Sequence, residues 1–161
     1  MSEGYRKLSI DRFLFISAFG RDSDYPTEIY YQTAYLDLDN GEMLWVYEND
    51  EDAETEAGLD PEENRRDRER VVRDPDRFLD IPGLEHGDHH DILKRFLRSQ
   101  WTEDEERRLR VEEAYFGSIG GWKKAVDDQD AIDAFYAFQD EAFRELAEEY
   151  LMELGIIPIW K

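Results

Sequence analysis

The sequence predicts an α+β fold: a helix-dominated single domain in which one antiparallel β-hairpin, at about residues 29–47, packs on several helices. Two β-rich runs flank Asn40-Gly41, a preferred two-residue hairpin turn because both residue types tolerate a positive φ. Apolar residues keep helical spacing from about Asp130 to Leu154, which predicts a long C-terminal helix. The chain has 161 residues and no recurring period of 20 to 50 residues, so residues 1–161 are expected to form one domain.

The N-terminal segment Leu8–Phe19 is expected to form a short helix with Ser9 as its N-cap. An alternative stays open here, because the apolar run Phe13–Ile16 is equally typical of a buried strand. The helical reading places four apolar residues on one side: Ile10, Phe13, Leu14 and Ala18.

The hairpin is expected to consist of Ile29–Asp39 and Glu42–Tyr47. A two-residue turn at Asn40-Gly41 would fix the register between the two strands. A lone hairpin is marginal in water, so helices must cover its apolar face. The predicted pairs are Asp39 with Glu42, Leu38 with Met43, Leu36 with Trp45 and Ala34 with Tyr47.

The central part of the chain begins with an acidic segment. Asn49–Glu63 contains eight acids and no base, and we expect an exposed, mobile loop there. Asp60-Pro61 has the form of a helix start, and the arginine-rich helix that follows should end near Arg73. The apolar anchors of this helix are Val71 and Val72.

Further elements follow from local signals. Phe78–Pro82 should be a short extended segment, and Asp88 should cap a helix with an apolar stripe. Thr102 and Glu105 form a capping-box pattern for a helix to about Phe116. Gly155 should end the C-terminal helix, with Ile156 folding back on its last turn. The expected stripe is Ile92, Leu93, Phe96 and Leu97.

The chain is strongly acidic, with 41 acidic residues, 20 basic residues and a formal net charge of −21. This charge excludes direct electrostatic binding of nucleic acid, which needs a surplus of Lys and Arg. Three interpretations remain: a solvated surface that opposes aggregation, adaptation to high salt, or an acidic face that binds a basic partner or mimics nucleic acid.

Composition also bounds the location and the chemistry. The chain has no Cys, so disulfides, thiolate nucleophiles and cysteine zinc sites are excluded. The N-terminus shows no signal-peptide pattern, and no stretch approaches the roughly 18 apolar residues of a membrane span. We therefore expect a soluble cytoplasmic protein without membrane contact, and its oligomeric state stays open.

Four stretches resemble an uncharacterised bacterial protein family, number 0158, over about residues 8–158. They are Tyr35–Glu42, Asp74–Pro82, Gly117–Lys123, and Phe135–Asp140 with Leu151 and Gly155-Ile156. The run Asp74–Pro82 is the most characteristic of them. One departure matters, because Gly120-Gly121 stands where the family tends to carry an arginine pair, and Ile119 stands where it has its first aromatic. The resemblance implies a bacterial protein of the fold described above and implies no activity.

A glycine-rich segment at 117–124 is the first candidate site. Backbone N–H groups of such a turn can hold an anion, and two lysines would add charge. The alternative is a connection between helices in which Trp122 fills the core. The candidate ligand-binding residues are Gly117, Gly120, Gly121, Trp122, Lys123 and Lys124.

The arginine-rich helix is the second candidate, as an interaction surface made of Arg65, Arg66, Arg68 and Arg70. Its alternative is local neutralisation of the acidic segment that precedes it. The three histidines, His86, His89 and His90, form the one histidine cluster of the sequence, and such neighbours at a helix start could hold zinc or nickel. Metal ligands must also converge from other elements, and His89 and His90 point about 100° apart and do not chelate together, so surface histidines are expected. No metal or other cofactor is predicted.

These observations favour a non-enzymatic protein-interaction or regulatory module with an acidic surface, because the sequence holds no recognisable catalytic constellation. A small anionic-ligand-binding or hydrolytic protein that uses the turn at 117–124 is the alternative. A nucleic-acid mimic is the third hypothesis, and it needs carboxylates at phosphate-like spacing on one face.

Overall fold

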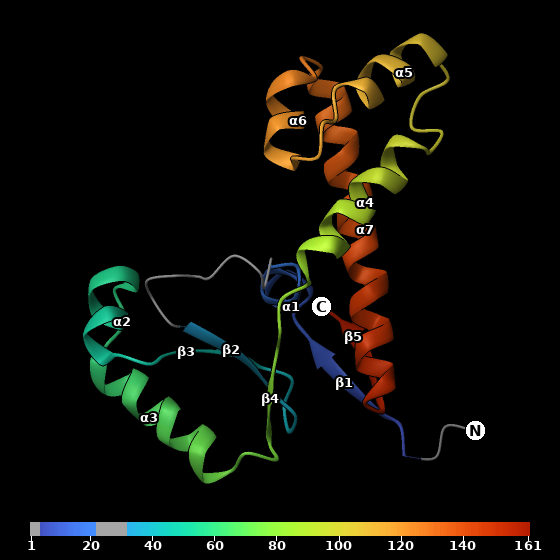
Figure 1. Cartoon of the computed structure of the whole chain (residues 1–161). Helices are drawn as coiled ribbons and strands as arrows, with labels where there is room; N and C mark the ends of the chain where they lie inside the picture. Colours follow the sequence, from blue (N-terminus) through green and yellow to red (C-terminus); the bar gives the residue numbers. More distant parts are fainter. Residues whose placement is uncertain (1–3, 22–31) are drawn as a thin grey trace. The chain divides into compact units, whose positions relative to one another are not determined.

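The computed structural model describes residues 4–21 and 32–161 and divides the chain into two units. Unit 1 comprises Met1–Leu84 and Ala147–Lys161, and unit 2 comprises Glu85–Leu146. The α+β class, the dominance of helix and the long C-terminal helix are confirmed (Figure 1). The expectation of a single domain stays a prediction.

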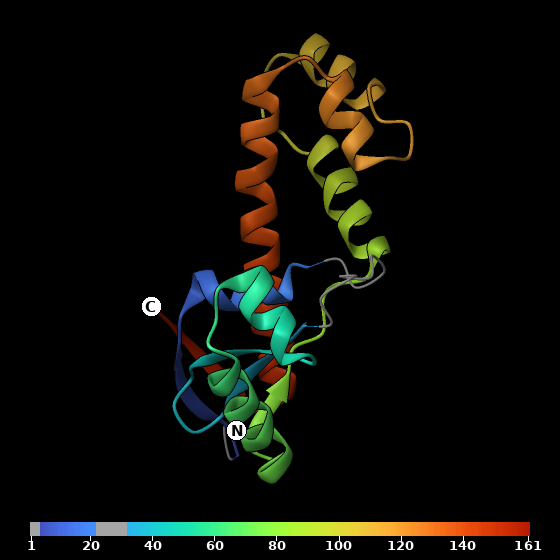
Figure 2. The ribbon, with the colours of Figure 1, turned by 90° about the vertical axis from the view of Figure 1, so that its left-hand side faces the viewer.

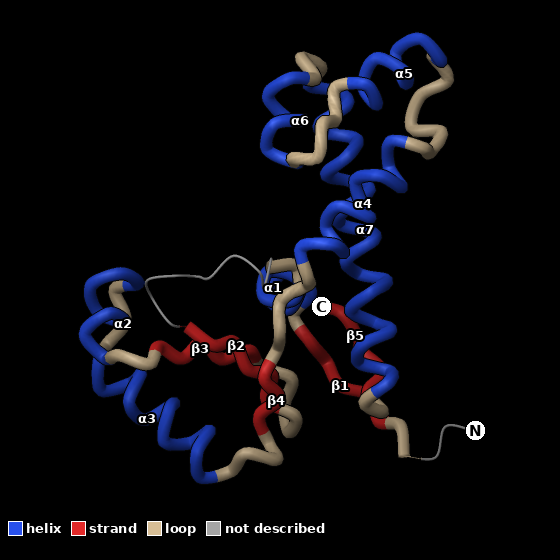
Figure 3. The backbone as a smooth tube through the Cα atoms, viewed as in Figure 1, coloured by secondary structure: helices blue, strands red, loops and turns tan. Residues whose placement is uncertain are grey.

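Unit 1 holds all the strands of the described residues (Figure 3). β2, β3 and β4 form an antiparallel sheet in the order β3-β2-β4, so the predicted hairpin gains a third strand from the predicted extended segment. The elements are β1 (Arg6–Ile10), α1 (Arg12–Phe19), β2 (Gln32–Asp37), β3 (Met43–Tyr47), α2 (Asp50–Ala57), α3 (Pro61–Arg73), β4 (Phe78–Asp80) and β5 (Ile156–Trp160).

The predicted hairpin register is wrong by two residues. Leu36 pairs with Met43 instead of Trp45, and because the shift is even, each residue keeps its expected face of the sheet. Side chains build a longer loop: the Asp37 carboxylate accepts from the Asp39 N–H at 2.9 Å, and the Asn40 side chain accepts from the Glu42 N–H at 2.9 Å. Residues 29–31 of the predicted first strand lie outside the described residues.

Gly41 is required at the hairpin loop for two reasons. Its φ is +79°, a conformation that favours glycine. A Cβ atom there would lie 1.8 Å from the carbonyl oxygen of Ser9 in β1, so no side chain fits. The loop therefore approaches β1 through backbone alone.

The N-terminal prediction is wrong at its start. Residues 6–10 form β1, which pairs in parallel with β5, and Asp11 in place of Ser9 caps α1 by accepting from the Leu14 N–H at 2.9 Å. Since residues 12–19 are helical, the strand alternative for Phe13–Ile16 is also wrong. Phe13 is 77% exposed, and the helix buries a different set: Phe15, Ile16, Ala18 and Phe19.

The expected fold-back of Ile156 is likewise wrong, because Ile156 begins β5 and pairs with Arg6. Gly155, at a φ of +79°, ends α7 as predicted. The two strands are about 150 residues apart in the sequence, so no local signal joins them.

The expected loop at 49–63 is wrong for most of its length, because Asp50–Ala57 form α2. Asn49 caps this helix by accepting from the Glu51 N–H at 2.8 Å, and three acids in the first turn suit the positive helix end. Gly58 ends it in the left-handed conformation. The cap at Asp60 and the end of α3 at Arg73 are confirmed.

Unit 2 is helical, and its helices α4, α5 and α6 lie with the first part of α7 (Figure 2). The buried stripe of α4 is confirmed, but Glu85 in place of Asp88 is its N-cap. Asp104 in place of Thr102 caps α5, which ends before Phe116. The elements are α4 (His86–Leu97), α5 (Glu105–Glu113), α6 (Ile119–Ala125) and α7 (Gln129–Glu153), of which residues 147–153 belong to unit 1.

Candidate interaction surface

One side of α3 presents a continuous exposed stripe, which we call the outward face of α3. The stripe follows the spacing of a helix, and its three arginines and two glutamates give a net charge of +1 in a chain of −21. Its one apolar member, Val72, is 76% exposed. The outward face consists of Glu62, Arg65, Arg66, Glu69, Val72 and Arg73.

The opposite side of α3 is fixed by Asn64, which is 2% exposed. The Asn64 side-chain oxygen accepts from the Tyr47 N–H at 2.8 Å. Its amide nitrogen donates to the Tyr47 carbonyl at 2.9 Å and to Asp50 at 2.7 Å. A single side chain therefore satisfies both backbone groups of the last residue of β3 and ties α3 to the start of α2.

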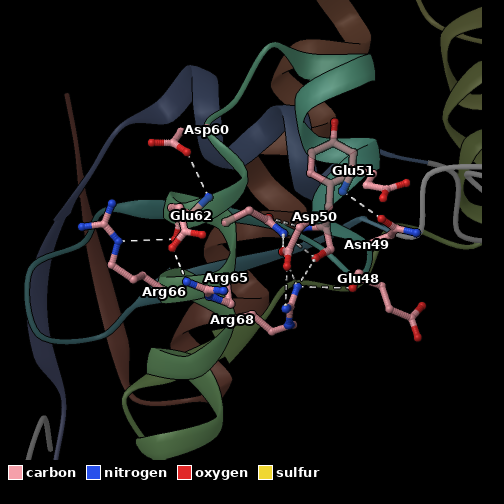
Figure 4. A network of polar contacts seen from close by, with 11 residues as sticks. Glu48, Asn49, Asp50, Glu51, Asp60, Glu62, Arg65, Arg66 and Arg68 are labelled. Atoms are coloured by element: carbon pink, nitrogen blue, oxygen red, sulfur yellow. Dashed lines mark hydrogen bonds and ion pairs between the residues drawn. The ribbon is translucent and has the colours of Figure 1, made fainter.

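Arg68 extends this network toward α2 (Figure 4). Its guanidinium binds both carboxylate oxygens of Asp50, at 2.7 and 3.1 Å, and donates to the carbonyls of Tyr47 and Glu48. Hydrogen bonds from Arg68 and then from Asn64 lower the pKa of Asp50 from 3.8 to about 2. The same pairing raises the pKa of Arg68. At neutral pH both groups are charged, so the network orients α3 on the unit.

The four arginines of the predicted surface divide into two pairs. Arg65 and Arg66 belong to the outward face, where Arg65 forms an ion pair with Glu62 and Arg66 donates to the Glu62 carbonyl at 3.3 Å. Arg68 is committed to Asp50, as described above. Arg70 lies 3.3 Å from Asp67 and 3.9 Å from Asp37. The pairs of Arg68 with Asp50 and of Arg65 with Glu62 support the local-neutralisation alternative, because both acids belong to the segment 49–63, whereas the acids that pair with Arg70 lie outside it.

Val72 and Arg73 border an open hollow on α3 of about 380 Å³, together with Arg68 and Glu69. The sequence prediction treated Val72 as an anchor of the core, which is wrong. The exposure of Val72 could have been predicted from the sequence. The charged residues at 62, 65, 66, 69 and 73 have helical spacing, which places residue 72 on the same side of the helix. Nothing in the sequence pattern pointed to Asn64.

A buried ion pair joins two of the stretches that carry the family resemblance. The Asp37 carboxylate is 2% exposed and receives hydrogen bonds from Arg77 at 2.8 and 2.9 Å. Burial acts to raise the pKa of Asp37, but the bonds from Arg77 and the Asp39 N–H, with the charges of Arg77 and Arg70, leave it lowered. The two stretches also share a strand pairing, of Asp37 with Phe78. Their residues therefore hold the sheet together.

The glycine-rich candidate lies in unit 2 around α6. The Ser118 hydroxyl accepts from the Gly121 N–H at 3.0 Å, so the cap already uses one donor of this turn. Trp122 is fully buried and its indole donates to the Val111 carbonyl at 3.0 Å. Lys123 lies 4.7 Å from the centre of the Tyr136 ring. These contacts support the alternative in which the segment packs helices.

The remaining candidate residues of this segment lie at its surface. Gly117, Gly120 and Lys124 are exposed, and Gly117 has a φ of +90°. The structure thus brings Gly121 and Ser118 together in the helix cap. Lys123 packs on the Tyr136 ring, whereas the neighbouring Lys124 is exposed.

Residues 4–21 and 32–161 contain no group of three or more His, Cys, Asp or Glu that could hold a metal ion. Within the same ranges, no helix combines the length and the apolar character needed to cross a bilayer.

Comparison of the chain with known proteins finds no matching family model, no similar curated protein and no similar solved structure.

Proposed function

We propose that this chain is a non-enzymatic protein-interaction module that binds its partner through the outward face of α3. The observation that carries the proposal is the exposure of Val72, 76%, beside Arg73 in an open hollow of a helix whose other side is anchored by buried hydrogen bonds. Because α3 is already ordered, its backbone loses little entropy on binding, and exposed arginine side chains are common at the centres of specific interfaces.

The composition of the outward face indicates the chemistry of the partner. Arg65, Arg66 and Arg73 offer planar guanidinium groups that bind carboxylates in a bidentate manner, and Val72 offers an apolar contact between them. A protein surface with an apolar side chain flanked by carboxylates would match it. Nucleic acid is disfavoured, because the net charge of −21 repels a phosphate backbone.

A charge-reversal experiment tests this proposal. The double variant Val72→Asp/Arg73→Glu places two acids in the hollow, and Lys94→Glu, an exposed position on α4, is the control for charge reversal elsewhere. Affinity isolation at physiological salt should recover a stoichiometric partner with the wild type and with Lys94→Glu. The double variant should lose it. Recovery of no partner, or equal recovery by all three, would contradict the proposal.

The rival hypotheses receive less support. An anionic ligand at 117–124 would compete with the Ser118 cap for the Gly121 N–H and could not reach the buried indole of Trp122. Nucleic-acid mimicry needs a continuous acidic stripe, whereas the outward face of α3 interrupts the acidic surface with three arginines.

We also propose that the protein acts in the cytoplasm of a bacterial cell and belongs to uncharacterised protein family 0158. The absence of Cys and the four resembling stretches support this proposal. The excess of acids over bases is in keeping with a solvated surface or with adaptation to high salt.

A further inference from the structure

Two histidines of α4 face each other one helical turn apart. His86 and His90 are separated by four positions, which places them on the same side of the helix. Their Nε2 atoms lie 2.8 Å apart, and their ring centres are 4.4 Å apart with nearly perpendicular planes. Both side chains are partly exposed, so solutes reach them.

Tyr115 sets the orientation of one of these rings. Its hydroxyl forms a hydrogen bond with His90 Nδ1, the nitrogen on the far side of the ring from His86. When Nδ1–H donates to this oxygen, the Nε2 lone pair of His90 points toward His86. Outer hydrogen bonds of this kind fix the tautomer of histidine metal ligands.

The two Nε2 atoms lie at hydrogen-bond distance, so one ring donates its proton to the other when no metal is bound. A metal ion could replace this proton and be held by both nitrogens. With metal–nitrogen distances of about 2.0 to 2.1 Å, a nitrogen separation of 2.8 Å gives an angle at the metal of about 85°. Such an angle is close to the right angle of square-planar or octahedral sites and far from the tetrahedral angle, which favours Ni²⁺ or Cu²⁺ over Zn²⁺.

We propose that His86 and His90 form a binding site for a divalent late transition metal, Ni²⁺ or Cu²⁺, with Tyr115 as its positioning residue. The two Nε2 atoms supply two cis ligands, and water supplies the others. The inference is independent of the function proposed for α3.

The expectation that all three histidines lie on the surface is wrong for His89, which is buried. His89 is 9% exposed and meets the Phe143 ring edge to face at 5.6 Å. The spacing of four residues between His86 and His90 is the sequence feature that predicts two histidines on one side of the helix.

Titration of the full-length, tag-free protein tests the site. Ni²⁺ is titrated in a calorimeter in the presence of millimolar Mg²⁺, which occupies adventitious carboxylate sites because it prefers oxygen ligands. We expect one Ni²⁺ per chain. His86→Gln and His90→Gln should each weaken the affinity at least tenfold, and Tyr115→Phe should weaken it by about tenfold. His89→Leu is the matched control, because it removes the third histidine and leaves the pair intact.

The outcomes separate clearly. Stoichiometric binding that is lost in His86→Gln and kept in His89→Leu, with far-UV circular dichroism unchanged, supports the site. If His90→Gln does not fold, His86→Gln alone decides, since its ring lies in the first turn of α4. Absence of heat from the wild type, or binding that is equal in wild type and His86→Gln, overturns the proposal.

Discussion

The attachment of α3 in unit 1 and the core of unit 2 are built from opposite chemistry. α3 is held by a buried amide, Asn64, and by the ion pair of Arg68 with Asp50. Unit 2 is held by rings around Phe96, whose centre lies 5.5 to 6.3 Å from the centres of its four partners. Two of these partners, Trp122 and Phe135, lie 5.3 Å from each other. The partners of Phe96 are Trp101, Trp122, Phe135 and Phe138.

This difference shows how a chain with a net charge of −21 can fold and still hold one helix, α3, in a fixed orientation. Aromatic burial does not depend on charge, so it offsets the self-repulsion of the acids. Hydrogen bonds and ion pairs contribute less net stability, but they fix direction. A polar network therefore suits the helix whose orientation matters for binding.

The largest loss of stability is expected from removing a buried aromatic ring of unit 2. Trp122→Ala removes a fully buried ring and leaves a cavity, which should lower the free energy of unfolding by about 3 to 5 kcal/mol. Urea titration followed by far-UV circular dichroism measures it. Phe116→Ala is the control, because Phe116 is 87% exposed and should change stability by less than about 0.5 kcal/mol. Equal losses in the two variants would contradict the ring-based core.

A smaller loss of stability is expected from removing the Asn64 hydrogen bonds that hold α3. Asn64→Ala leaves the buried N–H and C=O of Tyr47 without their partner, which should cost about 2 to 3 kcal/mol. Hydrogen exchange of the α3 amides should rise with it. The neighbouring exposed change Glu63→Ala should leave both within about 0.5 kcal/mol of the wild type. An Asn64→Ala variant as stable as the wild type would mean that the network does not hold α3.

The smallest effect concerns pH. The folded pKa of Asp50 is about 2 against an ordinary value of 3.8, so its contribution to stability is complete above pH 4 or so and is lost as the pH falls through about 2. Asp50→Asn should therefore lose less stability between about pH 4 and pH 2 than the wild type does. Urea titrations across this range measure the slope, with the exposed change Glu51→Gln as control.

Asp128 of unit 2 has a carboxyl pKa lowered in the same way as that of Asp50. Arg107 binds Asp128 through two hydrogen bonds of 2.6 and 2.7 Å and lowers the pKa of this carboxyl to about 2. Asp128→Asn should flatten the acid slope as Asp50→Asn does, while the ring contacts of Phe96 persist. A slope unchanged in both variants would show that these pairs do not govern acid stability.

Local signals predicted much of the helical structure. The spacing of apolar residues located α7 within one residue at each end, and Asp60-Pro61 located the start of α3. The signals for α2 were also present, in the Asn49 cap and in Gly58, but the eight acids of the segment outweighed them in the prediction.

Long-range pairing was not predictable in the same way. The sequence predicted a helix where β1 lies and a fold-back onto the last helical turn where β5 begins. The two strands pair with each other from opposite ends of the chain, so no local signal indicated either of them. The hairpin register depended on the Asp37 and Asn40 side chains, which bond to the backbone and lengthen the loop. The candidate surface was half predicted: Arg65 and Arg66 lie on it, whereas Arg68 and Arg70 are turned to carboxylates of unit 1.

The most direct test of the role of α3 is the affinity of its isolated partner for three forms of the full-length chain, measured by calorimetry at physiological salt. We predict that Val72→Asp/Arg73→Glu weakens binding at least tenfold, or about 1.4 kcal/mol, and that Lys94→Glu changes it less than twofold. Equal affinities of all three forms, with each form folded, would contradict the assignment of the outward face of α3 as the binding surface.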